Sequence, residues 1–532
     1  MVRPITLDEE ETPVDRFLKE QQRLQTPVTR VVHVDKTDSS PDQAAYYKSL
    51  IPLTAPGEGE QYSFEVDLDK CTGCKACVSA CHSLNGLEDE ETWRDIGLIH
   101  GGTETNSYQQ TITTACHHCT DPGCMNGCPV NAYEKDDITG IVMHLDDQCI
   151  GCQYCVFKCP YDVPKYSEDL GIVRKCDMCH SRLATSEAPA CVQACPNEAI
   201  AINIVNKAEV ESCLLENPDS FLPSSPNPQY TFPTTTYKTK KTIPENTKAS
   251  DSNVIYPQHP HYPLVLMLVL TQFSVGALAA SLLTQAAGMA LNVISLTACA
   301  IGLAASTIHL GKPLKAWRAF LGLRKSWLSR EIVVFGAYFP LLAAYTGAQL
   351  ITFFEIPTFI EIPHFLIIAA GCGAMVSGLA GVFCSIMIYH DTPRRLWHFN
   401  YSGTKFFGAT LIFGLASAAI IFNSQFALIS LILVSIATLA QDAHLLSFVK
   451  SELATEEYYS ARIHLESDLT ATRLRFVLLG AGGIIIPLAM ILGSHSITLA
   501  SIGLALCLGG LLAERYLFFR ASVAPKMPGG IA

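Results

Sequence analysis

Sixteen cysteines between Cys71 and Cys195 constrain the fold of this chain more than any other feature of its sequence. They form four groups: Cys71, Cys74, Cys77 and Cys81; Cys116, Cys119, Cys124 and Cys128; Cys149, Cys152, Cys155 and Cys159; and Cys176, Cys179, Cys191 and Cys195. The first and third groups read C-x2-C-x2-C-x3-C, and the other two are the same run with a longer middle. In bacterial ferredoxins this run gives three thiolates to one 4Fe-4S cluster and the fourth to a neighbouring cluster. Sixteen thiolates therefore predict four 4Fe-4S clusters.

Structural zinc is the alternative, because paired CxxC motifs also form four-thiolate zinc sites. Proline follows the last cysteine in three of the four groups, at Pro129, Pro160 and Pro196, and the exception is His82. Zinc sites do not account for these repeated C-x3-C-P endings or for the triplets of cysteines. The pattern therefore favours iron–sulfur clusters.

The chain divides into a polar, cysteine-rich front and an apolar back. With 49% hydrophobic residues and a mean hydropathy of +0.25, its 532 residues are too apolar for one soluble domain. We predict an extended N-terminal arm at 1–60, a cluster domain at 61–215, a Pro/Thr-rich segment at 216–261 and a membrane anchor at 262–525. The composition of residues 216–261 predicts a linker or surface strap that forms no core.

Charge and the N-terminal residues narrow the classes of function. A formal charge of -12 argues against a nucleic-acid partner. The first residues contain no basic stretch followed by an apolar one and no twin arginine, so we expect no export signal. The rest of the arm shows only a short helical pattern at 14–24, with plain disorder as the alternative to an extended arm.

Three short segments with alternating apolar and polar residues lie beside the cysteine groups, at 62–66, 140–145 and 199–204. Each predicts a short strand. Such strands, with small helices between the cysteine loops, are the units of a ferredoxin-like fold, which we expect to occur twice. Three histidines lie between the cysteines: His117, His118 and His180. We expect them to face solvent, the alternative being hydrogen bonds to cluster sulfur.

Eight apolar segments in the back half are each long enough to cross a bilayer, which needs about 20 apolar residues. They are residues 262–284, 289–309, 331–352, 364–389, 403–422, 425–447, 472–494 and 497–519. A soluble helical bundle is the alternative, but the segments carry almost no internal charge. The predicted fold class is therefore α+β, a double ferredoxin-like four-cluster domain, followed by an all-α transmembrane bundle of eight helices.

Basic residues are distributed unevenly between the two ends of these segments. With eight spans, the cluster domain and the C-terminus lie on the same side of the membrane. The loops expected on that side carry Lys312, Lys315, Arg318, Arg324, Lys325, Arg330, Arg394, Arg395, Lys405, Lys450, Arg462, Arg473, Arg475, Arg515, Arg520 and Lys526, and the opposite loops carry no Lys or Arg. The positive-inside rule then predicts a multi-pass protein of the bacterial inner membrane with its cluster domain in the cytoplasm.

The cysteine-rich half resembles the four-cluster electron-transfer subunit of the dimethyl sulfoxide reductase family of molybdenum enzymes. The resemblance rests on DKCTGCKAC at 69–77, CHHCTDPGCMNGCP at 116–129 and CIGCQYCVFKCPYDVPKY at 149–166. The membrane half is similar to the anchor subunit of the same family, in HYPL at 261–264, ASTIHLGKPLKA at 305–316, LSRE at 328–331 and ERYLF at 514–518. The chain thus resembles both subunits fused into one polypeptide.

The resemblance implies how the cysteine groups are shared among the clusters. The outer two groups pair, and the inner two groups pair, whereas the spacing alone leaves sequential pairing open. The four implied sets are Cys71, Cys74, Cys77 and Cys195; Cys176, Cys179, Cys191 and Cys81; Cys116, Cys119, Cys124 and Cys159; and Cys149, Cys152, Cys155 and Cys128. The inner lobe, 116–159, would lie nearest the membrane, and the outer lobe would face a molybdopterin-containing catalytic subunit.

Polar residues inside or at the ends of the predicted spans are the candidates for quinol chemistry. They are His309, Glu331, His390, Asp442, His444, Glu514 and Arg515, all near the cluster-side ends. The resemblance places His309 and Glu331 at the quinol site of the anchor subunit, where an imidazole or a carboxylate can accept a proton from the quinol hydroxyl. Haem b would need two histidines at matched depth, which His309, His390 and His444 leave open, but we do not expect it.

The predicted function follows from these parts together. We expect a subunit that oxidises menaquinol or ubiquinol from the quinone pool of the lipid bilayer. Its electrons would pass through four 4Fe-4S clusters to a separate molybdopterin catalytic subunit, as in an anaerobic dimethyl sulfoxide or nitrate reductase. Three alternatives are open: reverse flow from a substrate dehydrogenase to quinone, a redox-driven ion-translocating module, and an anchor without a quinone site.

Overall fold

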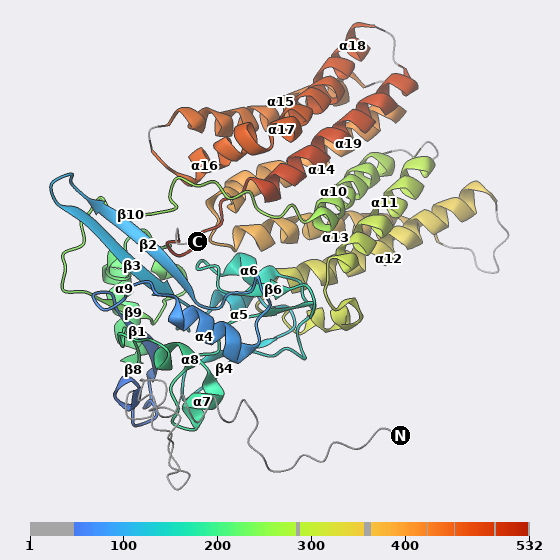
Figure 1. Ribbon diagram of the computed structural model, residues 1–532. Coiled ribbons are helices and arrows are strands. Elements are labelled where there is room, and N and C mark those ends of the chain that lie inside the picture. Colours follow the sequence, from blue (N-terminus) through green and yellow to red (C-terminus); the bar gives the residue numbers. More distant parts are fainter. Residues whose placement is uncertain are drawn as a thin grey trace, which may run out of the picture.

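The structure is a computed structural model, and it describes residues 47–283, 288–355, 363–422, 424–451, 453–493 and 496–529. A cluster domain lies at one end of a helical membrane domain (Figure 1). Most of the predicted N-terminal arm, and the whole of the helical pattern at 14–24, lies outside the described residues.

A three-stranded sheet joins the first and last cysteine groups. Strand β1 (Glu60–Asp67) pairs antiparallel with β8 (Ile200–Asn206) and parallel with β9 (Thr236–Lys238). The pairing of Val66 with Ile200 brings Cys71 and Cys195, which follow and precede these strands, to the same end of the sheet. The strands predicted at 62–66 and 199–204 are therefore confirmed.

The inner cysteine groups lie between smaller elements. Strand β5 (Val142–His144) confirms the third predicted strand and pairs with β4 (Tyr133–Lys135), and β6 (Lys165–Ser167) pairs with β7 (Ile172–Arg174). Short helices begin within or beside every cysteine group: α4 (Ala76–Asn85), α5 (Gly123–Gly127), α6 (Tyr154–Lys158), α7 (His180–Ala184) and α8 (Ala190–Gln193). These elements form two small units, each made of cysteine loops, helices and strands, and this is the ferredoxin-like arrangement.

A long hairpin in the cluster domain has no counterpart among the predicted strands. Strands β2 (Asp95–Gly102) and β3 (Ser107–Thr114) form it, and β10 (Lys248–Ala249) adds a third strand to its edge. Figure 1 shows the hairpin extending from the cluster domain on the side away from helices α10 to α13. The glycines at 97, 101 and 102 and the run of Thr and Gln residues in β3 hide the alternation that identifies a strand.

The segment 216–261 is a strap that packs against the cluster domain and contributes to its core. It contains helices η2 (Pro218–Ser220) and η3 (Pro228–Tyr230) and follows α9 (Lys207–Glu216). The prediction that it forms no core is wrong, because Phe221 and Leu222 are buried in the core of the cluster domain. The composition suggests a segment without a core because it is rich in threonine. In the structure these threonines form hydrogen bonds with the cluster loops: Thr234 Oγ1 donates to the carbonyl oxygen of His117 at 2.9 Å.

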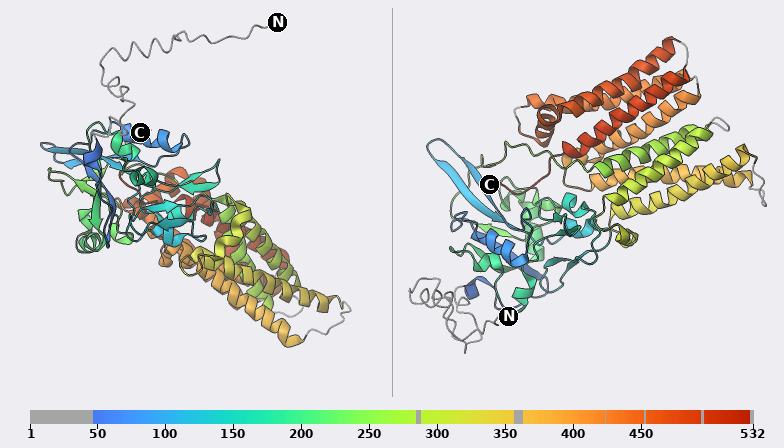
Figure 2. Two further views of the ribbon diagram at one scale, coloured as in Figure 1. Left: turned by 90° about the horizontal axis from the view of Figure 1, so that it is seen from below. Right: turned by 45° about the vertical axis from the view of Figure 1, so that its right-hand side comes forward.

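The eight predicted membrane helices are confirmed. The spans are Tyr262–Leu282 (α10), Met289–Ile308 (α11), Trp327–Phe353 (α12), His364–His390 (α13), Phe399–Ile421 (α14), Gln425–Lys450 (α15 and η6), Leu469–Leu492 (α17, η8 and α18) and Ile497–Arg520 (α19). The seventh span changes at Ala481–Ile485 to a π-helical turn, just before Pro487. The bundle extends away from the cluster domain, as both views of Figure 2 show.

Candidate functional site

Four cysteines line each of two cavities in the cluster domain. Set 1 consists of Cys71, Cys74, Cys77 and Cys195, which line one cavity together. Set 3 consists of Cys116, Cys119, Cys124 and Cys159, which line the other. Each cavity thus combines three cysteines of one sequence group with the last cysteine of another. Sequential pairing of the groups would have put Cys128 in place of Cys195 in the first cavity, and the structure does not place it there.

The remaining eight cysteines are neighbours in the same nested way. Set 2 consists of Cys81, Cys176, Cys179 and Cys191, and Cys81 interacts electrostatically with Cys179 and Cys191. Set 4 consists of Cys128, Cys149, Cys152 and Cys155, and Cys155 interacts with the other three. All of these thiols are free of disulfide bonds. Burial, with a contribution from Cys191, raises the pKa of the Cys81 thiol to about 12.

The spacing of the cysteines fits clusters better than single ions. In a tetrahedral zinc site with Zn–S distances near 2.3 Å, the sulfurs lie about 3.8 Å apart. Across the described residues, no group of three or more Cys, His, Asp or Glu side chains is close enough to hold one metal ion. A 4Fe-4S cluster spreads its four thiolates over a larger body. Cysteine sets that line cavities therefore fit clusters.

The loop backbone repeats between the first and third cysteine groups. Gly73 and Lys75 have φ angles of 71° and 62°, and Gly151 and Gln153 have φ angles of 69° and 59°. These left-handed residues turn the chain so that successive cysteines face one centre. Four backbone N–H groups then donate to cysteine sulfur: Ala132 to Cys128 (3.2 Å), Ala199 to Cys195 (3.2 Å), Gly151 to Cys149 (3.4 Å) and Met178 to Cys176 (3.4 Å). Such hydrogen bonds tune cluster potentials.

Two of the histidines between the cysteines are buried, and the prediction that they face solvent is wrong. His117 is 2% exposed and His118 is fully buried. His117 Nδ1 lies 2.9 Å from Thr235 Oγ1, and His118 Nδ1 accepts from the backbone N–H of Val142 at 3.0 Å. Threonines of the strap cover the two histidines. The sequence around the histidines does not indicate this cover, because the strap lies more than a hundred residues further along the chain.

The inner lobe sits directly on the membrane domain. A Cβ atom at Gly311, just after α11, would lie 2.1 Å from the carbonyl oxygen of Gly171, so the two backbones touch. Ser326 Oγ, at the start of α12, donates to the carbonyl oxygen of Gly127 at 2.7 Å, and the backbone N–H of Lys312 donates to that of Ile150 at 3.0 Å. The loops that carry Cys128 and the third cysteine group therefore lie against the cluster-side ends of the membrane helices.

Helix α6 of the inner lobe makes further contacts with α13. Tyr154 donates its hydroxyl to the carbonyl oxygen of Ile388 at 3.0 Å, and Lys158 pairs with Asp391 at 2.8 Å. Both side chains flank Cys155 and Cys159. This contact fixes sets 3 and 4 relative to the bundle.

Three histidines form a chain at this interface. The ring centroids of His259 and His261 are 4.8 Å apart, and those of His261 and His309 are 5.2 Å apart. His259 is exposed, His261 is buried and His309 is half-buried. Burial, together with the neighbouring histidines, lowers the pKa of His261 to about 3, and burial and His259 lower the pKa of His309 to about 4. Both imidazoles are therefore neutral at pH 7, and His261 Nδ1 and His309 Nε2 are buried without a hydrogen-bond partner.

The two predicted quinol residues are not in contact with each other in the described structure. His309 ends α11 and contacts His261, whereas Glu331 lies one turn inside α12 and hydrogen-bonds to Ser385 of α13. Glu331 is 5% exposed. The sequence motif HYPL contains His261, but nothing in that motif indicates that His261 faces His309.

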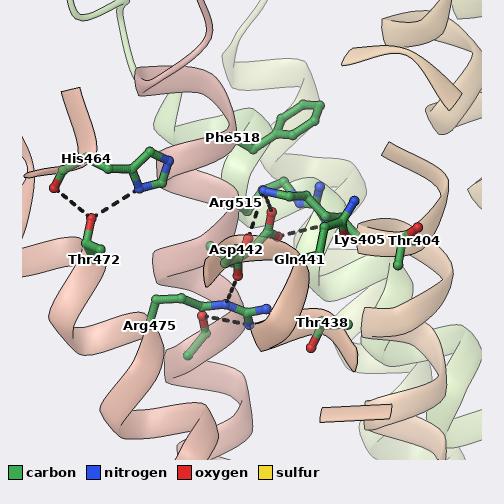
Figure 3. Close-up of polar contacts among 12 residues, drawn as sticks. Thr404, Lys405, Thr438, Gln441, Asp442, His464, Thr472, Arg475, Arg515 and Phe518 are labelled. Atoms are coloured by element: carbon green, nitrogen blue, oxygen red, sulfur yellow. Dashed lines mark hydrogen bonds and ion pairs between the residues drawn. The ribbon is translucent and has the colours of Figure 1, made fainter. Parts of the chain in front are cut away.

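A network of charged side chains lies among helices α14, α15, α17 and α19, near the cluster-side end of the bundle. Figure 3 shows Asp442 of α15 between Lys405 of α14 and Arg475 of α17. Lys405 Nζ lies 3.3 Å from Asp442 Oδ1 and 3.1 Å from Glu514 Oε1, and Arg475 Nε lies 2.9 Å from Asp442 Oδ2. Arg515 lies 3.4 Å from Glu514 and stacks on Phe406 at 3.8 Å.

This network corrects part of the sequence prediction. Lys405, Arg475 and Arg515 are among the basic residues expected in the cluster-side loops, but all three lie inside membrane helices. Arg475 and Arg515 are buried, and the side chain of Lys405 is 10% exposed. Helices α14 and α17 begin before the predicted limits of 403 and 472, and ion pairs across helices offset the cost of burying the charges. In the described parts of the spans, the ends far from the cluster domain carry no Lys, Arg, Asp or Glu.

Family profiles match both halves of the chain. Residues 62–83 match a 4Fe-4S binding domain, residues 108–205 match a 4Fe-4S dicluster domain, and residues 257–520 match the DMSO reductase anchor subunit (DmsC).

Individual relatives match the cysteine-rich half. The B subunit of the anaerobic dimethyl sulfoxide reductase of Haemophilus influenzae is 39% identical over 150 residues, which is 26% of this chain and 73% of that protein. The corresponding subunit of Escherichia coli K12 is 38% identical over 148 residues, 26% of this chain and 72% of that protein. The hydrogenase-2 operon protein HybA of Escherichia coli O157:H7 is 34% identical over 202 residues, 33% of this chain and 60% of that protein.

Cysteine loops for 4Fe-4S clusters, seated on eight membrane helices, define a multi-pass iron–sulfur electron-transfer protein. The chain belongs to the dimethyl sulfoxide reductase family, in which it combines the iron–sulfur subunit and the membrane anchor subunit in one polypeptide. Such a subunit works with a separate catalytic partner.

Proposed function

We propose that this chain oxidises a quinol, menaquinol or ubiquinol, and delivers the electrons through four 4Fe-4S clusters to a molybdopterin-containing catalytic subunit. The observation that carries the proposal is the contact of the inner lobe with the His261 and His309 end of the membrane helices. Phe157, between Cys155 and Cys159, packs on His261 at 5.2 Å. A quinol held at these histidines would lie next to the cluster domain.

The cysteine sets form a series from the membrane outward. Set 4 interacts with set 3 through Cys128 and Cys124, set 3 with set 2 through Cys116 and Cys176, and set 2 with set 1 through Cys191 and Cys77. We assign one 4Fe-4S cluster to each set, which when bound carries a single electron at a time. Electrons would leave at set 1 in the outer lobe, where the catalytic partner would bind.

Proton transfer in this proposal uses the neutral imidazoles. His309 and Glu331 are the proposed quinol residues, and His261 is a third candidate because its free Nδ1 lies between His309 and the exposed His259. A neutral imidazole can accept the proton of a quinol hydroxyl and pass it to the next ring. The protons would then reach the solvent on the cluster side.

Reverse electron flow is the second candidate, and the relatives give it some support. The formate dehydrogenase-O iron-sulfur subunit of Escherichia coli K12 is 32% identical over 158 residues, 26% of this chain and 52% of that protein. Its name describes a dehydrogenase, which delivers electrons in the opposite direction. Redox-driven ion translocation is disfavoured, because the described far ends of the spans lack charged groups for a path.

The basic loops support an orientation with the cluster domain in the cytoplasm of a bacterium. Lys312, Lys315 and Arg318 lie on the cluster side, and the described loops on the opposite side carry no Lys or Arg. The cluster-side loops remain richer in Lys and Arg than the opposite loops when Lys405, Arg475 and Arg515, which lie inside helices, are left out.

The test is quinol oxidation by the intact complex carrying His309→Ala and Glu331→Ala together. Loss of both proton acceptors should reduce the rate at least a hundredfold, since general base catalysis contributes about 10²–10⁴-fold. The measurement is quinol-dependent reduction of the clusters, followed by visible absorption. A Gly336→Ala variant is the matched control, because its surroundings are open. Iron analysis should give about sixteen irons per chain in every variant; full quinol activity in the double variant would refute the site.

A further inference from the structure

Among the described residues of the cluster domain, two buried cations form no ion pair with a carboxylate. Arg94 is 2% exposed and Lys175 is 3% exposed. The ion pairs of residues 47–283, which include all of the cluster domain described, contain neither side chain. A buried cation without an opposite charge is strongly unfavourable, so some other anion must lie beside each of them.

Arg94 lies between set 1 and set 2. Its Nη1 donates to Thr113 Oγ1 at 3.1 Å, and Thr113 Oγ1 lies 3.7 Å from the sulfur of Cys77. The guanidinium also lies over the ring of Phe64 at 4.6 Å, whereas its Nε and Nη2 are buried without a partner. Its electrostatic partners are the thiolates of Cys77, Cys81, Cys176 and Cys191.

Lys175 occupies the corresponding place between set 2 and set 3. Its Nζ donates to the carbonyl oxygens of Val142 and Cys176. The thiolates that face it are Cys116 and Cys124 of set 3 and Cys176 of set 2. Asp177 also interacts electrostatically with Lys175, after the three thiolates, but it forms no ion pair with Lys175 in the described structure, and its Oδ1 accepts from the backbone N–H of Cys179 at 2.9 Å.

We propose that Arg94 and Lys175 are the counter-charges of neighbouring clusters, Arg94 for sets 1 and 2 and Lys175 for sets 2 and 3. They are positioning residues for electron transfer: a fixed cation at each junction raises the reduction potential of the two clusters beside it. A cluster with four thiolates is negative and becomes more negative when it accepts an electron, so a nearby buried cation favours the reduced form. The inference rests on the proposed assignment of one cluster to each set. Neither Arg94 nor Lys175 is among the electrostatic neighbours of the set 4 cysteines beside the membrane, so we expect the potential of set 4 to be unaffected by substitution of either cation.

The test is a potentiometric titration of the purified full chain, in which a chemical reductant replaces quinol and electron paramagnetic resonance reports each cluster. Lys175→Met keeps the length of the side chain and removes its charge. We expect two of the four clusters to become harder to reduce by about tenfold in the equilibrium constant, which is 59 mV for one electron. Arg94→Met should shift two clusters, one of them shared with Lys175→Met. Lys238→Met is the control, since Lys238 is 62% exposed and salt screens it.

Four unchanged potentials in variants that hold full iron would overturn the proposal. Where a methionine variant loses iron, the charge-conserving variants Arg94→Lys and Lys175→Arg decide between charge and shape. Full iron in them supports the counter-charge role, and equal loss of iron overturns it. The titration uses neither quinol nor the catalytic partner, so failure of the proposed quinol oxidation would leave its result intact.

Discussion

His261 contacts both halves of the chain with one small ring. Phe157 of the cluster domain lies 5.2 Å from it, and Phe519 of α19 lies 5.7 Å from it. The residue precedes α10 with a φ angle of 48°, a left-handed conformation that costs a non-glycine residue roughly 1–2 kcal/mol. Strain of this kind is retained where surrounding contacts determine the conformation, and here they aim the imidazole at His309.

The lowered pKa values of these histidines predict an unusual pH dependence. The pKa of His261 is about 3 and the pKa of His309 is about 4, below the ordinary 6.5. Each ring therefore stays a neutral proton acceptor as the pH falls, and becomes protonated only when the pH passes through its own lowered pKa. We expect the rate of quinol oxidation to be flat between about pH 8 and pH 6 and to fall only below about pH 5.

The measurement is the rate of quinol-dependent cluster reduction across this range. The titratable and charged groups that face the two rings are His259 and Arg394. A His259→Gln variant separates the contribution of this exposed histidine from that of the two inner rings. A rate that falls with a midpoint near pH 6.5 in both proteins would contradict the assignment.

The membrane helices carry a charge network that does not balance. Lys405, Arg475 and Arg515 oppose only Asp442 and Glu514, so the five groups sum to one positive charge when all are ionised. Removing an anion leaves a larger unbalanced charge in a medium of low dielectric constant, and removing Lys405 leaves two pairs. Asp442→Asn should therefore destabilise the bundle by about 3–5 kcal/mol, and Lys405→Met should destabilise it by much less.

Thermal unfolding of the purified chain in detergent tests this order, with helix content as the signal. Thr404→Val, on the same helix, is the control for a polar substitution beside the network. Equal destabilisation by Asp442→Asn and Lys405→Met would show that the groups act as independent residues rather than as a network.

Elements differ in how far the sequence predicts them. Hydropathy predicts all eight membrane helices, because crossing lipid requires a long apolar run whatever the neighbours are. The strands β1, β5 and β8 are also predictable from their alternation. The burial of His117, the core position of Phe221 and the pairing of Lys405 with Asp442 depend on partners far apart in the chain. No local pattern carries that information. The spacing therefore predicts the four cysteine groups, whereas the sharing of cysteines among the sets comes from the family resemblance, and the buried residues around them cannot be predicted from the sequence.

Two chain segments connect the halves of the molecule, in addition to the contacts between the inner lobe and the membrane helices. The strap at 216–261 leads from the cluster domain to α10, and the C-terminal residues return from α19 to the cluster domain. Met527 is buried in the core of that domain, Lys526 pairs with Asp251 at 2.5 Å, and the backbone N–H of Leu98 donates to the carbonyl oxygen of Gly529 at 3.1 Å. Both ends of the membrane domain are thus tied to the cluster domain, so the proposed quinol site at their junction would keep its distance to set 4.

The position of the site also determines what turnover does to the membrane potential. His261, His309, Glu331 and the charge network all lie at the cluster-side ends of the spans, and the described far ends carry no charged residue. Protons taken from quinol should therefore be released on the cluster side, where a reductase would consume protons as well. Because neither electrons nor protons cross the bilayer, turnover should be electroneutral.

Sealed vesicles that contain the complete complex provide the measurement, with a voltage-sensitive dye inside and quinol as the electron donor. We expect steady oxidation of quinol with no change in the dye signal, and the same rate before and after a potassium ionophore collapses any potential. A protein with a proton path across the membrane would instead slow as the potential rises, and the ionophore would accelerate it, since each charge moved against 100 mV costs about 2.3 kcal/mol. A potential that grows in proportion to the quinol consumed, and that disappears in the His309→Ala and Glu331→Ala double variant, would place the quinol chemistry at this site but would refute release of its protons on the cluster side.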